Sequence, residues 1–159
     1  MKGIELLKQL HLNQNKLLYP SLPDYARFKP KYSDKTANGL TKCIKDYIEF
    51  NGGQAERINN TGRQIDDRTS VTDIFGNVRT IGSVMWIKGT GKNGTADISA
   101  TIQGRSVKIE VKIGRDKQSH AQKEYQQQVE KSGGLYFIAK DFESFLKWYN
   151  LKFISNGAE

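Results

Sequence analysis

Cysteine is almost missing from this sequence, and long apolar runs are missing altogether. Cys43 is the single cysteine in 159 residues, which excludes an internal disulfide and a cysteine-based zinc site. No apolar run approaches the roughly 20 residues that span a bilayer, and the N-terminus lacks the apolar segment and small-residue cleavage site of a signal peptide. These absences predict a soluble, cytoplasmic protein that does not contact membranes.

Acidic residues are in the minority. Lys and Arg total 25 against 17 Asp and Glu, which gives a formal net charge of +8. Such an excess attracts polyanions, because each phosphate contact releases condensed counterions. Nucleic acid is therefore a candidate partner, although a basic balance also serves solubility alone. The length suits one domain with one hydrophobic core.

Proline occurs only between residues 20 and 30. Because proline supplies no amide donor and restricts the preceding residue, this stretch is expected to form an extended arm. Its interleaved aromatic and basic side chains suit either contact with nucleic acid or packing on the domain surface. Residues 1–37 are accordingly assigned to an N-terminal helical and extended arm, and residues 151–159 to a C-terminal tail.

The sequence between these ends, residues 38–150, predicts a mixed α/β domain. Apolar residues at helical spacing predict helices over about 4–18, 36–51, 119–131 and from 142 onward. Strand-like runs cover 54–60, 84–88, 95–103, 105–113 and 135–139, with a hairpin turn at Gly76–Asn77. The Gly89–Gly94 stretch lacks the Gly and the Ser or Thr of a phosphate-binding loop, and is interpreted as a basic loop whose Lys92 contacts nucleic acid.

Charged side chains line one face of the strand expected over residues 105–113. Alternation places Glu110 and Lys112 on that face, opposite the apolar side chains of the same strand. A turn near Gly104 should bring Asp97, on the preceding strand, across from Glu110. Two carboxylates at that separation suit a hard cation such as Mg²⁺, and Lys112 then reaches a scissile phosphate or a metal-bound water. The alternative is a solvated strand face with ordinary cross-strand pairs.

A series of short motifs in a fixed order resembles the VRR-NUC branch of the PD-(D/E)XK nucleases over roughly residues 38–149. The matching pieces are Arg57–Gly62 as a first strand, Gly94–Asp97 as a Gly-x-x-Asp entry, Glu110–Lys112 as Glu-x-Lys, Ser119–Gln122 as Ser-x-x-Gln, and Gly133–Ile138 as a Gly-Gly strand. The resemblance implies a restriction-endonuclease-like mixed sheet flanked by helices. It also implies an endonuclease that hydrolyses DNA phosphodiester bonds with Mg²⁺ or Mn²⁺.

The resemblance further implies roles for individual residues. Asp97 and Glu110 would hold the metal with the carbonyl of Val111, Lys112 would be the catalytic lysine, and Gln122 would reach the site from its helix. Basic residues that flank the site are expected to grip phosphates, although they also fit a simple charged helix start: Arg115, Lys117 and Lys123.

One expected acid has no counterpart. The family usually carries a Glu on the first helix, and that position falls near Asn38 or Gly39. A catalytically weak or inactive DNA-binding module is therefore the second interpretation, and an interaction subunit that docks through its proline-containing arm is a third. Small stand-alone members resemble homodimeric enzymes of branched or four-way DNA, and a bacterial or phage-infected cell would fit so compact a chain.

Overall fold

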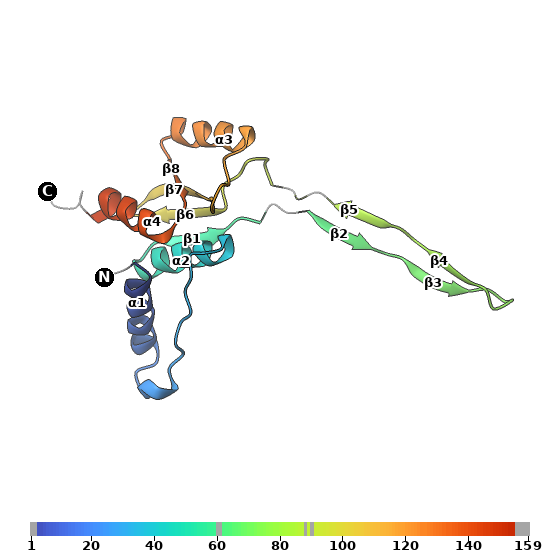
Figure 1. Ribbon diagram of the computed structural model, residues 1–159, viewed down its shortest axis with the longest axis horizontal. Helices are drawn as coiled ribbons and strands as arrows, with labels where there is room; N and C mark the ends of the chain where they lie inside the picture. The colour runs from blue at the N-terminus through green and yellow to red at the C-terminus, as the bar shows by residue number, and fades with distance from the viewer. Residues whose placement is uncertain (1–2, 60–61, 88, 90, 155–159) are drawn as a thin grey trace. The chain divides into compact units, whose positions relative to one another are not determined.

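The protein consists of two compact units, which are described separately. The computed structural model describes residues 3–59, 62–87, 89 and 91–154 (Figure 1). The first unit, here called the body, lies within residues 1–58 and 94–159, and the second, here called the ribbon, lies within residues 59–93. The N-terminal helix contributes Leu7 to the core of the body.

A four-stranded mixed sheet forms the centre of the body. Its order is β1 (Gln54–Arg57), β6 (Ile98–Ile102), β7 (Arg105–Val111) and β8 (Leu135–Ala139). The first three strands are antiparallel neighbours, whereas β8 runs parallel to β7 and returns to it through a helix. The expectation of a mixed α/β domain is confirmed.

Helices flank this sheet (Figure 1). Packed together on the apolar sheet face are α1 (Gly3–Leu18), α2 (Ala37–Phe50), α4 (Phe142–Tyr149) and the π-helical turn η2 (Asn150–Ile154). The helix that links β7 to β8, α3 (His120–Lys131), lies beside β8. Alternation in β7 explains the apolar face, since Val107, Ile109 and Val111 are all buried in the core.

Helix starts follow the side chains that cap them. Thr36 accepts a hydrogen bond from the backbone N–H of Gly39 at the start of α2, and Asp141 accepts one from Ser144 at the start of α4. These caps satisfy amide groups that the first turn of a helix leaves without partners. The predicted helices therefore begin within a residue or two of their expected positions.

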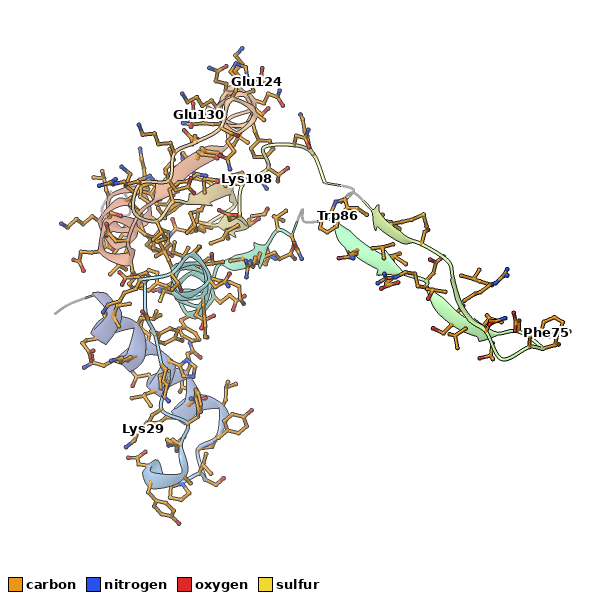
Figure 2. All side chains as sticks on the ribbon, turned by 45° about the vertical axis from the view of Figure 1, so that its right-hand side comes forward. Lys29, Phe75, Trp86, Lys108, Glu124 and Glu130 are labelled. Atoms are coloured by element: carbon orange, nitrogen blue, oxygen red, sulfur yellow. The ribbon has the colours of Figure 1, made fainter. Side chains whose placement is uncertain are left out.

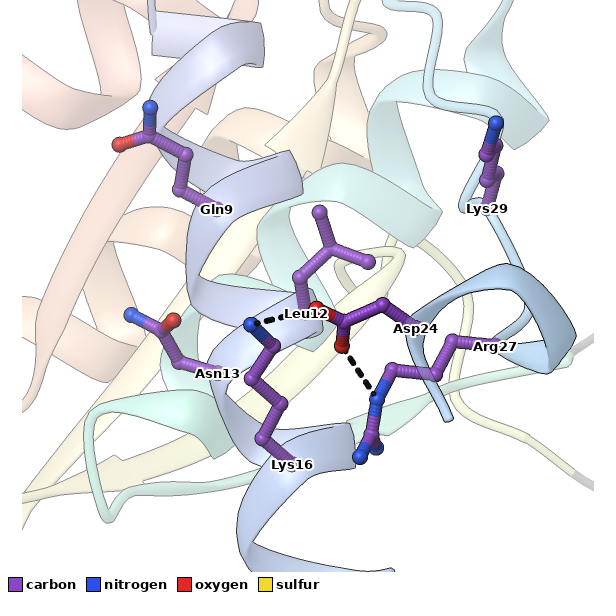
Figure 3. A pocket seen from close by; sticks show the side chains of 7 residues that line it. All are labelled: Gln9, Leu12, Asn13, Lys16, Asp24, Arg27 and Lys29. Carbon is purple, nitrogen blue, oxygen red and sulfur yellow. Dashed lines mark hydrogen bonds and ion pairs between the residues drawn. The ribbon is translucent and has the colours of Figure 1, made fainter. Parts of the chain in front are cut away.

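The proline-containing arm packs on the body, as one of its two interpretations required, but it is not extended throughout. A 3-10 turn, η1 (Asp24–Ala26), interrupts it. The Arg27 guanidinium donates to Asp24 and to the backbone carbonyl of Asn15, and Lys16 also contacts Asp24. Lys16, Asp24 and Arg27 are among the residues that line a pocket on α1, drawn in Figure 3. The volume of this pocket is about 430 Å³. Because the cations meet a carboxylate and a carbonyl within the chain, this cluster fastens the arm to α1.

The ribbon is one long hairpin. Its strands are β2 (Arg63–Asp66) with β5 (Val84–Ile87), and β3 (Thr69–Thr72) with β4 (Val78–Ile81). One register runs through both ladders, and the Asp73 and Asn77 backbones close a turn over residues 74–76, slightly before the position expected at Gly76–Asn77. Gly82 has a φ of 104° and lies against the Asp67 carbonyl, so only glycine fits. In the described part of the chain, no helix is long and apolar enough to cross a membrane.

Candidate active site

The β6–β7 turn brings the two predicted carboxylates together. Gln103 and Gly104 form a two-residue turn, and both have positive φ, as a type I′ hairpin requires. This turn sets the register that pairs Ile98 with Ile109. One step further along the hairpin lie Asp97 and Glu110.

Glu110 is buried to an unusual degree for an acid. Its side chain is 2 % exposed. The Oε1 atom accepts a hydrogen bond from Nε2 of Gln122 and lies 3.2 Å from Nζ of Lys112. The Oε2 atom is also buried and has no hydrogen-bond partner among the described residues. An unsatisfied carboxylate oxygen in the protein interior is costly, which makes Oε2 a position prepared for a further ligand.

Asp97 is oriented by backbone groups. Its Oδ2 atom accepts the N–H of Val111 at 2.8 Å, and its carbonyl accepts the N–H of Ile58 at 2.8 Å. In an antiparallel ladder the N–H and C=O of one residue point toward the same neighbour, so the Val111 carbonyl also faces the Asp97 side. Asp97 therefore lies against Val111, and its charge is close enough to Glu110 to raise the pKa of that carboxyl group.

Lys112 is held between two acids. Its side chain is 9 % exposed, and Nζ lies 3.2 Å from Glu110 and 3.3 Å from Asp116. A buried ammonium group requires such compensation. Asp116 escaped the sequence analysis, although its position four residues after Lys112, beyond the strand end, offered a weak signal.

Gln122 enters the site because of how α3 begins. Its Oε1 accepts the backbone N–H of Ser119 while the Ser119 hydroxyl accepts the N–H of Gln122, which is a complete capping box. The same side chain uses Nε2 to bind Glu110. Gly94 packs directly against the Ala121 backbone at a φ of 78°, and a Cβ there would lie 2.3 Å from the Ala121 carbonyl oxygen. This close approach fits the Gly-x-x-Asp segment against the helix start.

Burial and charge determine the protonation of the two central groups. Burial, followed by the nearby Asp97 charge, raises the pKa of Glu110 to about 7, against the opposing effect of Lys112. Burial alone would lower the pKa of Lys112, but Glu110 and Asp116 outweigh it and leave that pKa above its ordinary value. Lys112 is therefore a cation at neutral pH and not a proton acceptor.

Two of the predicted phosphate-binding lysines lie beside Lys112. Lys117 and Lys123 line a pocket of about 310 Å³ together with Lys112, Asp116 and Lys140. Arg115 is exposed but is not among the residues that line this pocket, and Lys92 belongs to the ribbon. Lys140 was missed in the sequence, although it directly follows β8, whose residue Ala139 pairs in parallel with Val111. The ends of parallel neighbours meet at one sheet edge, so the signal was available once that pairing was known.

Further polar residues share the sheet face of Glu110. Lys108, labelled in Figure 2, lies two positions before it. Its ammonium group donates a hydrogen bond to the Ser99 hydroxyl. Tyr136 pairs with Lys108 from β8, and burial together with the Glu110 charge raises the pKa of its hydroxyl. The polar row of β7 is therefore continuous with polar groups of both neighbouring strands.

The first turn of α2, where the resembled family usually carries a Glu, contains no acid, in keeping with the sequence. Asn38, in the first turn of α2, accepts a hydrogen bond from the Arg57 guanidinium at 2.8 Å. No group of three or more His, Cys, Asp or Glu suited to a metal occurs among the described residues. Mg²⁺ is commonly held by one or two carboxylates and completes its shell with water and substrate phosphate. The Asp97 carboxylate and the Glu110 carboxylate, whose Oε2 atom has no hydrogen-bond partner among the described residues, would suit such an ion.

Comparison with known proteins adds no further assignment. No protein-family model matches the sequence, and no curated protein matches it. The candidate site consequently rests on its geometry and on the motifs that the sequence contains.

Glu110 makes the stability of the metal-free protein depend on pH. Its pKa is raised from 4.5 to about 7 by folding, so the folded state binds this proton more tightly than the unfolded chain. The stabilisation is fully present below the unfolded pKa and is lost as the pH rises through about 7. Between about pH 5 and 8, the unfolding free energy of the wild type should therefore fall by roughly 2 kcal/mol relative to Glu110→Gln.

Urea unfolding in EDTA at a series of pH values measures this difference. The control is Glu56→Gln, which changes an exposed carboxyl group on β1 and should preserve the wild-type profile. Parallel profiles for the wild type and Glu110→Gln would contradict the expected dependence.

Proposed function

We propose that this protein is a metal-dependent endonuclease that hydrolyses DNA phosphodiester bonds, with Asp97, Glu110 and Lys112 at its chemical centre. The proposal rests mainly on one observation, the burial of Glu110 against Lys112 with one carboxylate oxygen left without a partner. Structural ion pairs are normally satisfied on both sides, whereas catalytic centres accumulate buried and perturbed charges.

The order of motifs supports a VRR-NUC-like assignment within the PD-(D/E)XK nucleases. Residues that the resemblance links are connected in space: Asp97 directly precedes β6 and binds Val111 of β7, and Gln122 of α3 binds Glu110 of β7. The four-stranded mixed sheet flanked by helices is compatible with a restriction-endonuclease-like fold. A preference for branched or four-way DNA follows only from the resemblance and belongs to the same proposal.

Asp97 and Glu110, with the Val111 carbonyl, would hold Mg²⁺ or Mn²⁺. Such an ion polarises a phosphoryl oxygen and lowers the pKa of an attacking water. Gln122 keeps the Glu110 carboxylate turned so that Oε2 remains available, while the N–H of Val111 fixes Asp97. These contacts prepare the carboxylates before any substrate arrives, which lowers the cost of reorganisation.

Lys112 supplies positive charge where a pentacovalent phosphate would gain negative charge. Since its pKa is raised, it stabilises an anion or positions a water molecule and does not remove a proton. The adjacent pocket carries Lys117, Lys123 and Lys140, which gives the neighbouring phosphates of a DNA strand several cations to contact.

Divalent cation should stabilise the folded protein through the two carboxylates. At about 100 times its dissociation constant, a ligand of the folded state adds about 2.7 kcal/mol to the free energy of unfolding. Thermal unfolding with and without Mn²⁺ should show this gain for the wild type and not for Asp97→Asn. Glu124→Gln, which changes an exposed acid of α3, should keep the full response. An equal response in Asp97→Asn would remove Asp97 from the metal site.

Loss of the Lys112 charge should abolish most cleavage. We expect Lys112→Met to reduce the rate roughly a hundredfold or more, because a preorganised charge at the reacting phosphate contributes that much. The assay uses labelled linear, nicked, flapped and four-way DNA with Mg²⁺, Mn²⁺ or EDTA. Lys147→Met, on α4, is the matched control. Metal-dependent cleavage that survives in Lys112→Met would exclude this lysine from catalysis.

A DNA-binding module without catalysis is the second candidate function. It is favoured by the presence of Asn38 where an acid is expected, and by the hydrogen bond that Asn38 accepts from Arg57.

Under either candidate function, Lys140 should contact phosphate. Lys140→Ala should weaken binding to all DNA sequences similarly and reduce the slope of log affinity against log salt by about 1. Fluorescence anisotropy measures both quantities, with Lys147→Ala as the control. An unchanged slope would show that Lys140 does not contact the backbone.

A further inference from the structure

Several large apolar side chains of the ribbon are exposed to solvent. Trp86 is 68 % exposed near its base and Phe75 is 82 % exposed at its tip (Figure 2). An isolated two-stranded hairpin is marginally stable in water, and apolar strands that remain exposed usually mark an interface. The exposed apolar side chains of the ribbon therefore indicate an interface with a partner.

The two edges of the ribbon differ in charge. One edge consists of β2, β3 and the link between them (residues 63–72), and it carries four charged residues: Arg63, Asp66, Asp67 and Arg68. The other edge consists of β4, β5 and the link at Gly82 and Ser83 (residues 78–87), and it carries Arg79 alone and contains neither lysine nor proline. Its exposed apolar residues are Val78, Ile81, Val84, Met85, Trp86 and Ile87. Charged residues and prolines protect an edge strand from pairing, so the second edge is the unprotected one.

The register identifies the backbone groups that this edge presents. The N–H of Asp67 donates to Ser83, and the N–H of Asp73 donates to Asn77. Hydrogen-bonded pairs recur at every second residue of an antiparallel ladder. The intervening residues, Val78, Thr80, Val84 and Trp86, therefore point their N–H and C=O groups outward.

We propose that two copies of this chain pair the strands over residues 78–87, edge to edge and antiparallel, to form a four-stranded sheet about a two-fold axis. The outward groups would then bond to those of the second copy, which is the usual chemistry of strand addition. This inference concerns assembly and does not depend on the nuclease activity.

The strand is complementary to itself when the axis passes through Gly82. Thr80 of each copy then faces Val84 of the other, and Val78 faces Trp86, an aromatic and β-branched pair that sheets favour. At the axis itself two glycines meet, so no side chains collide there. Acidic and basic residues balance along residues 62–87, which include the paired strands, with three Arg and three Asp, whereas Lys88 and Lys92 leave the whole ribbon with a net charge of +2. The balance along the strands favours a protein partner over a polyanion at this edge.

Proline substitution at one registered pair tests the proposal. Thr80 and Ser70 face each other across the ribbon, and each directs its N–H away from the other strand. Thr80→Pro removes an outward donor from the unprotected edge, whereas Ser70→Pro removes the equivalent donor from the charged edge. Neither change removes a hydrogen bond within the ribbon. Sedimentation of the full chain over about a hundredfold concentration range measures the monomer–dimer equilibrium.

We expect a dimer for the wild type and Ser70→Pro, and a dissociation constant at least about tenfold higher for Thr80→Pro. A second matched pair, Trp86→Lys and Gln64→Lys, should behave in the same way, because Gln64 and Trp86 are also registered across the ribbon. Circular dichroism confirms folding of each variant. A monomeric wild type, equal dimerisation of Thr80→Pro and the wild type, or equal losses in Ser70→Pro and Thr80→Pro would each overturn the proposal.

Discussion

A carboxylate that is nearly inaccessible to solvent must be compensated, and the contacts around Glu110 organise the candidate site. Lys112 and Gln122 both bind its Oε1 atom, while Asp97 adds a like charge that works against ionisation. The metal-free protein therefore retains a carboxyl group that is hard to ionise beside a lysine that stays charged. A carboxyl group that is hard to ionise beside a charged lysine is energetically unfavourable in a purely structural core. A divalent cation between the two carboxylates would favour their ionised forms.

Fold and site share individual side chains, so neither can shift alone. Gln122 completes the capping box of α3 with its oxygen and binds Glu110 with its nitrogen. On the other side, the turn at Gln103–Gly104 sets the register that places Asp97 near Glu110. A different start for α3 or a one-residue slip of the hairpin would separate the groups. The site is thus positioned by elements whose local sequence signals are strong.

Those signals explain how much the sequence could predict. Alternation along residues 105–113 predicted the polar row with Glu110 and Lys112, and the helix starts followed from their caps. The position of Gln122 required the family resemblance, since a polar residue on a helix has no obvious target. Lys140 and Asp116 were missed because their proximity to Lys112 depends on tertiary neighbours: the parallel β7–β8 pairing for one and the chain path after β7 for the other. The turn of the ribbon was recognised, but the division of the chain into two units depends on long-range contacts within each unit, which no local pattern reports.

Charge is distributed unevenly along the chain. Residues 62–87 contain equal numbers of Arg and Asp, so the net charge of +8 resides in the rest of the chain, which also holds the lysine-lined pocket beside Lys112. Under the proposed function, the lysine-lined pocket of the body would contact a polyanion, whereas the apolar edge of the ribbon would offer hydrogen bonds and β-branched side chains to another strand. If two ribbons pair, the residues of that contact are different from the residues of the lysine-lined pocket, which belong to the body. Assembly and the proposed substrate binding would then use different residues and different chemistry.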